Sequence, residues 1–105
     1  MDFPVVIFCT TASEHEARLI SESLVKEKLA ACVNRLPGIQ SMYIWEGKLC
    51  DDQEWLLIMK SKKSVLDQVI SKIKSIHSYD TPEIIALPIM GGSEDYLNWL
   101  ETNTQ

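Results

Sequence analysis

Apolar positions predict that the chain begins with a buried strand and continues into an amphipathic helix. The run at residues 4–9 is short and almost wholly apolar, which is typical of a buried strand. Ser13 and Glu16 have the spacing of a capping box, so the sequence predicts a helix over residues 14–29. At ~100° per residue, one apolar stripe of this segment consists of Ala17, Ile20, Leu24 and Ala31.

A long β-hairpin is predicted over residues 30–60. Its first strand contains a bend at Pro37-Gly38, and the chain reverses around Gly47, which supplies the backbone freedom of a tight turn. The return strand is predicted over residues 53–60, because apolar residues alternate there with a period of two.

Large apolar side chains occupy both faces of this hairpin. Met42 and Ile44 fall on one face of the first strand, whereas Tyr43 and Trp45 fall on the other. In the return strand one face carries Trp55, Leu57 and Met59, and the other carries Glu54, Leu56, Ile58 and Lys60. A sheet wetted on one side would alternate apolar with polar residues. We therefore expect something to cover the second face.

The second half of the chain repeats the order of helix and strand. Ser64 with Asp67 predicts a capped helix start, and a wide apolar stripe follows, made of Val65, Leu66, Val69, Ile70, Ile73 and Ile76. A fourth strand is predicted over residues 83–90, broken or edged by Pro88. Ser93 then caps a short last helix whose apolar face holds Tyr96, Trp99 and Leu100.

This order predicts an α+β fold of the ferredoxin-like βαββαβ type, with an extra C-terminal helix and a long hairpin. Both long helices would then cover one face of a four-stranded antiparallel sheet, and the other face would stay open in a lone subunit. Burying one large apolar side chain is worth roughly 1.5–3 kcal/mol. A closed homo-oligomer is therefore predicted.

Composition and charge exclude several classes of protein. The 105 residues suffice for one domain, predicted over residues 1–105, and 46% of them are hydrophobic. The formal net charge is −5 and no basic cluster follows one face, so we expect no nucleic-acid partner. No apolar run reaches the ~20 residues of a membrane helix, and the start lacks the pattern of a signal peptide. Together with an odd number of cysteines, three, these features predict a cytoplasmic protein without a disulfide framework.

Motifs distributed over nearly the whole chain resemble those of the CutA family, also called divalent-cation tolerance proteins. The matching segments are Phe8-Cys9-Thr10, residues 27–34, Pro37-Gly38, and residues 41–48, 54–60, 77–85 and 96–100. The resemblance implies a ferredoxin-like subunit in a tight homotrimer, in which strands of one subunit extend the sheet of the next. It also implies a non-catalytic role in tolerance of copper and other divalent metal ions.

The resemblance further implies a candidate metal site. The copper site proposed for the family combines the cysteine that ends the first strand with two adjacent histidines that end the second helix. Cys9 and His77 match two of these positions, whereas Ile76 replaces the remaining histidine. Thiolate and imidazole suit Cu²⁺ or Zn²⁺. The alternatives are that Cys9 is a small buried residue and that His77 caps a helix.

Polar groups in or beside the strands form a second candidate site. Glu54, Lys60, Tyr79, Glu83 and Trp45 are expected at an interface or in a ligand cleft between subunits. A buried Lys60–carboxylate pair could act as a structural bridge or read a ligand. The competing hypotheses of function are a trimer that binds divalent metals and a sensor like the P-II signalling class, which binds a small anion between subunits. A scaffold and, last, a hydrolase or transferase that uses Cys9 stay open.

Overall fold

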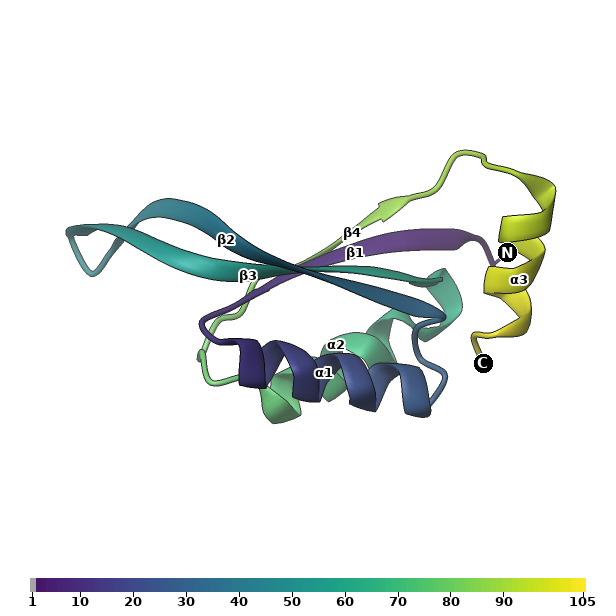
Figure 1. Cartoon of the computed structure of the whole chain (residues 1–105), viewed down its shortest axis with the longest axis horizontal. Coiled ribbons are helices and arrows are strands. Elements are labelled where there is room, and N and C mark those ends of the chain that lie inside the picture. The colour runs from purple at the N-terminus through teal and green to yellow at the C-terminus, as the bar shows by residue number, and fades with distance from the viewer. Residues whose placement is uncertain (1) are drawn as a thin grey trace.

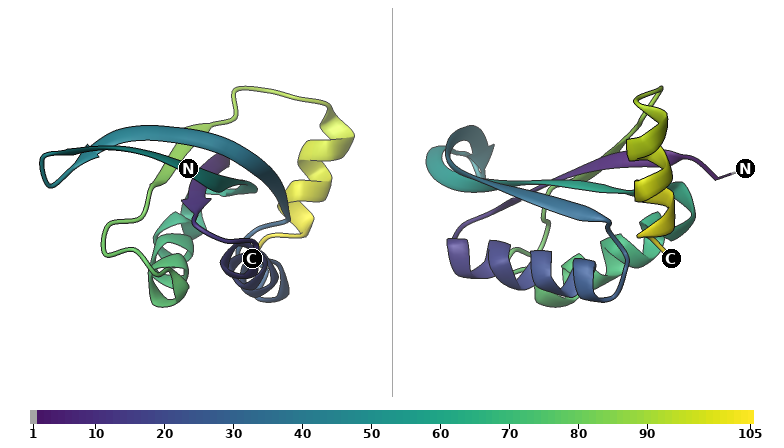
Figure 2. Two further views of the ribbon diagram at one scale, coloured as in Figure 1. Left: turned by 60° about the vertical axis from the view of Figure 1, so that its left-hand side comes forward. Right: turned by 45° about the vertical axis from the view of Figure 1, so that its right-hand side comes forward.

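Four strands form one antiparallel sheet, and two helices pack against one of its faces. The computed structural model describes residues 2–105, and its elements are β1 (Pro4–Thr11), α1 (Glu14–Lys26), β2 (Cys32–Trp45), β3 (Lys48–Lys62), a 3₁₀ turn (Lys63–Val65), α2 (Leu66–Ile76), β4 (Ile84–Pro88) and α3 (Glu94–Thr102). The strand order is β2-β3-β1-β4 with every pair antiparallel. Figure 1 and Figure 2 show α1 and α2 side by side beneath the sheet, with α3 at its end. The predicted order of elements is confirmed.

The core lies between this sheet and the two long helices. Alternate residues of β1 and β3 point toward the helices and are buried, among them Ile7 and Met59, which pair with each other. Ile20, Leu24, Val69 and Ile73 meet them from α1 and α2 and are fully buried. The apolar stripes predicted for both helices therefore face the core, and at roughly 1.5–3 kcal/mol for each large side chain they hold the layers together.

None of the helices of residues 2–105 packs on the opposite face of the sheet. Phe8 and Ile58 lie opposite each other on this helix-free face and are half-buried. Ile85 and Leu87 on β4 are 53% and 47% exposed. Strands β2 and β4 form the two edges, so each presents unpaired backbone groups in one chain. No helix among residues 2–105 combines the length and apolar character needed to cross a membrane.

Beyond the body of the sheet, β2 and β3 continue as a two-stranded arm. Figure 1 shows this arm extending away from the helices. At its tip Glu46 and Gly47 have φ values of 49° and 78°, the left-handed pair that a two-residue hairpin turn of type I′ needs. Ile44 pairs with Leu49 near the tip, and each is 71% exposed.

The bend predicted at Pro37-Gly38 is a β-bulge within one continuous strand. Leu36 pairs with Leu56, and the next pair is Ile39 with Glu54, so β2 gains one residue over β3. Gly38 has a φ of 76°, which explains the glycine. Because of the extra residue, even and odd positions of β2 change sides at the bulge. Before the bulge the even-numbered residues of β2 lie on the same face as Leu56, and after the bulge the odd-numbered residues of β2 lie on that face.

Several predicted boundaries were wrong, because backbone hydrogen bonds set them. Helix α1 ends at Lys26 and not at residue 29, since Lys28 takes a φ of 56° and the Leu29 N–H donates back to the Leu24 carbonyl at 2.9 Å. Ala31 therefore leaves the helical stripe. Strand β3 begins at Lys48 rather than 53, and β4 covers only Ile84–Pro88 rather than 83–90.

The capping box predicted at Ser64 and Asp67 was also wrong. A 3₁₀ turn precedes α2, whose N-cap is Val65 without a side-chain hydrogen bond. Ser64 instead donates its N–H and its hydroxyl to the Asp2 carboxylate, at 2.9 and 2.8 Å. By contrast, Ser93 caps α3 as predicted, accepting from the Tyr96 N–H at 3.3 Å.

Substituting Gly38 tests the bulge. A Cβ at Gly38 would meet only the Gln53 side chain, at 3.9 Å, so the cost of Gly38→Ala comes from the positive φ alone. We expect a loss of about 1 kcal/mol in the free energy of unfolding, measured by denaturant titration at fixed protein concentration. Gly91→Ala is the matched control, because Gly91 has open space around it and no positive φ. Equal stability of the two variants would contradict this account of the bulge.

Candidate functional site

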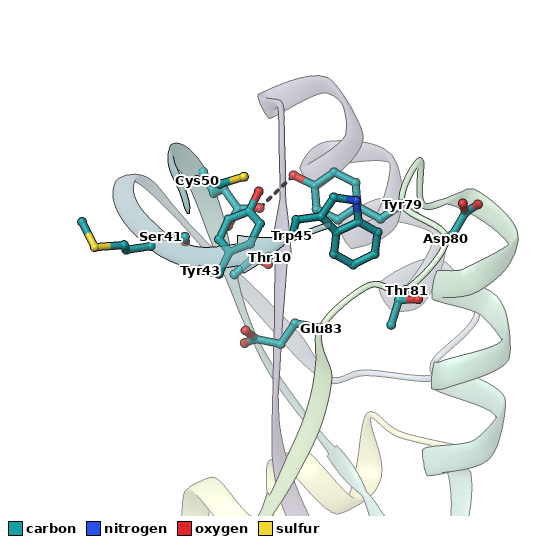
Figure 3. Close-up of a pocket in the computed structure, with 11 residues that line it drawn as sticks. Thr10, Ser41, Tyr43, Trp45, Cys50, Tyr79, Asp80, Thr81 and Glu83 are labelled. Carbon is teal, nitrogen blue, oxygen red and sulfur yellow. Dashed lines mark hydrogen bonds between the residues drawn. The ribbon is translucent and has the colours of Figure 1, made fainter. Parts of the chain in front are cut away.

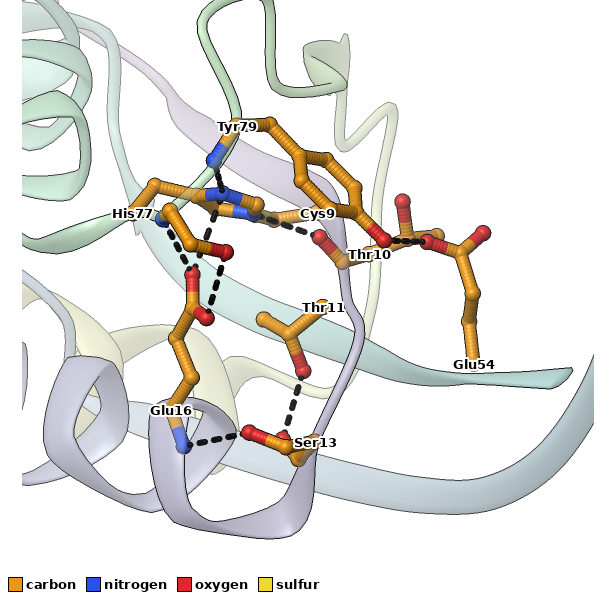
Figure 4. Close-up of polar contacts among 9 residues, drawn as sticks. Cys9, Thr10, Thr11, Ser13, Glu16, Glu54, His77 and Tyr79 are labelled. Atoms are coloured by element: carbon orange, nitrogen blue, oxygen red, sulfur yellow. Dashed lines mark hydrogen bonds and ion pairs between the residues drawn. The ribbon is translucent and has the colours of Figure 1, made fainter. Parts of the chain in front are cut away.

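His77 lies at the junction of α2, β1 and the loop that follows α2. It is the C-cap of α2, donating its backbone N–H to the Ile73 carbonyl at 2.8 Å. Its side chain is 0% exposed. Ring Nε2 lies 2.7 Å from the Thr10 carbonyl oxygen, to which it donates, and Nδ1 accepts from the Tyr79 backbone N–H at 3.1 Å (Figure 4). Both ring nitrogens therefore have partners within the protein.

Glu16 ties the same loop to the start of α1. Its backbone N–H donates to the Ser13 hydroxyl at 3.2 Å, which confirms Ser13 as the N-cap. Its carboxylate does not complete the predicted capping box: Oε1 accepts from the Ser78 N–H at 2.7 Å and Oε2 accepts from the Ser78 hydroxyl at 2.9 Å (Figure 4). Oε1 also lies 3.1 Å from His77 Nδ1. This carboxylate thus fixes the loop after α2.

Cys9 lies beside this cluster at the centre of the core. Its side chain is fully buried, and its Sγ is 3.7 Å from the Thr10 carbonyl oxygen, the same oxygen that His77 contacts. Burial raises the pKa of the thiol to about 12, and the nearby carboxylates of Glu83, Glu16 and Glu54 act in the same direction. The thiol is therefore neutral near pH 7.

The arrangement of Cys9 and His77 does not fit a bound metal ion. A metal binds the thiolate, which burial disfavours here, and it binds an imidazole nitrogen with a free lone pair. The His77 nitrogens are engaged with Thr10 and with the Tyr79 N–H. Within residues 2–105, no three His, Cys, Asp or Glu side chains are grouped so as to hold a metal.

A pocket of about 650 Å³ lies on the helix-free side, where the arm leaves the sheet. Figure 3 shows the arm on one side of it and the loop before β4 on the other. Its walls are formed by Thr10, Ser41, Met42, Tyr43, Trp45, Cys50, Glu54, Tyr79, Asp80, Thr81 and Glu83. Four predicted cleft residues therefore come together here, namely Trp45, Glu54, Tyr79 and Glu83.

Glu54 forms the base of this pocket. It is only 6% exposed, and its Oε2 accepts from the Tyr79 hydroxyl at 2.8 Å. Burial, and then the hydrogen bond to Glu54, raise the pKa of Tyr79, so its hydroxyl stays protonated and keeps donating at neutral pH. This bond attaches the loop before β4 to β3.

A second tyrosine–carboxylate pair lies on the arm. The Tyr43 hydroxyl donates to the Asp52 carboxylate, and this bond raises the pKa of Tyr43 to about 12. Tyr43 and Trp45 share a face with Cys50 and Asp52, because Tyr43 pairs with Cys50 across the arm. The bulge at Gly38 is what turns these two rings toward the side of Glu54.

The pocket has acidic charge without basic charge in its walls. Glu54, Asp80 and Glu83 contribute carboxylates, whereas the lining residues include neither lysine nor arginine. Such a site attracts cations and repels anions.

Lys60 forms no ion pair with a carboxylate among residues 2–105. Its Nζ donates to the Asn34 side-chain oxygen on the helix-free face, across the β2–β3 pair. Lys60 is not among the residues that line the pocket. Glu54 has the Tyr79 hydroxyl as its partner instead.

Sequence reasoning missed the contributions of Glu16, Thr10 and Asp80. The sequence indicates Glu16 only as a capping residue and ends the first strand at residue 9, whereas β1 continues to Thr11. Asp80 lies in the sequence between Tyr79 and Glu83, two predicted site residues, and this position was the available indication of its role. No local pattern, however, indicates that this loop lies against the base of the arm.

Comparison with known proteins gives consistent matches over nearly the whole chain. Residues 5–103 match the family described as CutA1 divalent ion tolerance protein. The chain is 46% identical over 99 residues to the divalent-cation tolerance protein CutA of Thermus thermophilus, covering 94% of this chain and 96% of that protein. It is 46% identical over 101 residues to the chloroplastic protein CutA of Arabidopsis thaliana, covering 96% of this chain. The chain spans 56% of that plant protein's length.

Solved structures resemble this one equally closely. The divalent cation tolerance protein of Thermus thermophilus superposes with a TM-score of 0.95 at 44% identity, covering 98% of this chain and 100% of that one. CutA1 of Oryza sativa gives a TM-score of 0.95 at 46% identity, covering 97% of this chain and 94% of that one. The periplasmic divalent cation tolerance protein CutA of Archaeoglobus fulgidus gives 0.94 at 37% identity, covering 98% and 100%.

The buried thiol predicts that stability falls at alkaline pH. In the folded protein the pKa of the Cys9 thiol is raised to about 12, whereas the ordinary pKa of a cysteine thiol is 9.0. Between these values the unfolded chain binds fewer protons than the folded one, so rising pH favours unfolding. We expect Cys9→Ala to lower the slope of stability against pH by about 1 kcal/mol per pH unit over this range. Equilibrium unfolding at several pH values measures it.

Cys50→Ala is the control for this experiment, because Cys50 lies on the arm and outside the core. The wild type and the control should retain the same slope. The pKa values of Tyr43 and Tyr79 are also raised, so these tyrosines contribute to the slope of stability against pH in every variant. An unchanged slope in Cys9→Ala would show that the thiol ionises as freely in the folded protein as in the unfolded one.

Proposed function

We propose, since the chain belongs to the CutA1 divalent ion tolerance family, that this protein acts as a non-catalytic homotrimer that binds divalent metal ions, copper among them. The observation that carries the proposal is the charge of the pocket at the base of the arm. Glu54, Asp80 and Glu83 supply carboxylates there, and no lysine or arginine lines it. Carboxylate oxygens attract divalent cations.

The same observation counts against the sensor of small anions. An anion site needs backbone N–H groups at a helix start or the side chains of lysine or arginine. The pocket walls instead carry three carboxylates. A phosphate or carboxylate ligand entering this pocket would meet repulsion rather than a counter-charge.

The proposed metal binding is weak and retains water on the ion. A tight site needs several protein ligands converging on one point. Within the described chain, residues 2–105, no three candidate ligands converge in this way. Cys9 and His77, the ligands implied by resemblance, would first have to give up their contacts with the Thr10 carbonyl oxygen.

A non-catalytic role agrees with how the reactive side chains are used. A nucleophilic cysteine is partly exposed and has a lowered pKa. Cys9 is fully buried and its pKa is raised to about 12. The described cysteines are all free thiols, which favours the reducing cytoplasm as the proposed location.

The trimer is supported by the apolar surface and by the free edges of the sheet. Ile44 and Leu49 on the arm and Ile85 on β4 are more than half exposed in a single chain. Strands β2 and β4 are the two edges of the sheet. Pairing the β2 edge of one copy with the β4 edge of the next is a heterologous contact, which closes into a ring when the rotation is a third of a turn.

The oligomeric state is the first test. Light scattering after size exclusion at micromolar concentration should give a mass near three times 11.9 kDa. Ile44→Asp on the arm should dissociate the trimer, because it places a charge on the surface that the neighbour covers. Leu19→Asp is the control, since Leu19 is 43% exposed on α1, away from the sheet. A monomeric wild type would overturn the trimer.

Calorimetric titration tests where divalent metals bind. Mn²⁺, which prefers oxygen ligands, and Cu²⁺ are titrated into the wild type and into the double variant Glu54→Gln, Glu83→Gln. We expect the double variant to bind Mn²⁺ about tenfold more weakly, a change of about 1.4 kcal/mol. His77→Gln should leave the Mn²⁺ affinity unchanged.

Two results would contradict this assignment. Unchanged Mn²⁺ binding in the double variant would exclude the pocket carboxylates as ligands. Loss of Cu²⁺ binding in Cys9→Ala alone would place the metal at the cysteine implied by the family resemblance. Inorganic phosphate, titrated in parallel, should give no heat of binding, and a phosphate affinity above that for metals would favour the anion sensor.

A further inference from the structure

The pocket at the base of the arm is aromatic as well as acidic. Three of its lining residues are Tyr43, Trp45 and Tyr79, which come from two separate segments of the chain. Each ring is partly exposed, at 39%, 54% and 36%. Figure 3 shows the three rings around the pocket, with the Glu83 carboxylate projecting beside them. Aromatic rings of this kind are not ligands for bare metal ions, because metal ions bind oxygen, nitrogen or sulfur atoms of the protein.

Glu54 adds a buried negative charge to these rings. It is 6% exposed, and its Oε2 accepts a hydrogen bond from the Tyr79 hydroxyl at 2.8 Å. No lysine, arginine or histidine of residues 2–105 forms an ion pair with it. A buried carboxylate without a counter-charge is costly, and a cation in the pocket would reduce that cost.

Together these features suit a cation whose charge is spread over an apolar body. A quaternary or alkylated ammonium group is attracted to the faces of tryptophan and tyrosine within about 6 Å of the ring centre. It needs no set of converging oxygen ligands, which the described chain lacks here. The volume of about 650 Å³ leaves room for an ammonium head and a short alkyl or hydroxyalkyl arm.

We infer that this pocket binds a small organic ammonium ion, with its head group against Tyr43, Trp45 and Tyr79 and its charge balanced by Glu54 and Glu83. This inference shares with the proposed function the preference of the pocket for cations, but it names a ligand class other than divalent metals. All the residues that line the pocket belong to one chain.

A pair of isosteric probes tests the charge of the ligand. Choline and its neutral analogue 3,3-dimethylbutan-1-ol have nearly the same shape, but only choline is charged. Each is titrated into the full chain and followed by saturation-transfer NMR. We expect choline to bind at least tenfold more tightly than the alcohol, because the alcohol keeps the apolar contact and loses the cation–π and carboxylate attraction.

Two variants test the residues of the pocket, and a third variant serves as the control. Trp45→Leu and Glu54→Gln should each weaken choline binding about fivefold to tenfold, since they remove a ring face and a charge. Glu54→Gln keeps an oxygen that can accept from the Tyr79 hydroxyl, and its melting curve checks that it folds. Trp99→Leu is the matched control, because Trp99 is 44% exposed on α3 and does not line the pocket. It should bind choline like the wild type.

The outcomes separate this inference from the metal proposal. Absence of choline binding, equal binding of the neutral alcohol, or an unchanged affinity in Trp45→Leu would each overturn the ammonium site. Mn²⁺ binding could persist in all of these cases. Choline binding without any Mn²⁺ binding would support the ammonium site and overturn the proposed role of the pocket in metal binding.

Discussion

The antiparallel pairing of β2 with β3 is the interaction on which the rest of this structure depends. The pair begins beside the helices and continues well beyond them as the arm (Figure 1). Over the body of the sheet, its register directs Leu57 and Met59 into the core and leaves Leu56 and Ile58 on the helix-free face. Farther out, beyond the one-residue shift at the bulge, the pairing places Tyr43 and Trp45 on the side of Glu54. Core, uncovered face and pocket are therefore consequences of one ladder of backbone hydrogen bonds.

The loop between α2 and β4 is fixed at two points by carboxylates from distant parts of the chain. Glu16 on α1 accepts both hydrogen bonds of Ser78, and Glu54 on β3 accepts that of Tyr79. His77 fills the space between them and contacts β1 through the Thr10 carbonyl oxygen. Every buried side-chain nitrogen or oxygen of the described residues has a hydrogen-bond partner. Cys9 and His77 thus stabilise the structure behind the pocket, whereas Glu54, Tyr79 and Glu83 line the pocket itself.

The arrangement of layers could be predicted from sequence because apolar periodicity reports burial directly. The stripe ending at Ile76 and the alternation around Met59 were sufficient for the order of elements and for the helix-covered face. Helix and strand ends were less predictable, since they depend on backbone hydrogen bonds such as that from Leu29 to Leu24. The site was predicted as a set of residues and not as a geometry. Glu54, Tyr79, Glu83 and Trp45 line one pocket of a single chain, whereas Lys60 lies outside it, because its partner Asn34 is set by the cross-strand register.

The bulge at Pro37-Gly38 uncouples the length of β2 from the side to which its side chains point. Leu36 pairs with Leu56 before the bulge and Ile39 pairs with Glu54 after it, so deletion of Gly38 would restore regular pairing and keep both pairs. Tyr43 would still pair with Cys50, and the two rings of the arm would stay on the side of Glu54, because paired residues share a face. Related proteins can therefore differ by one residue in length at this point and still present the same side chains to the pocket.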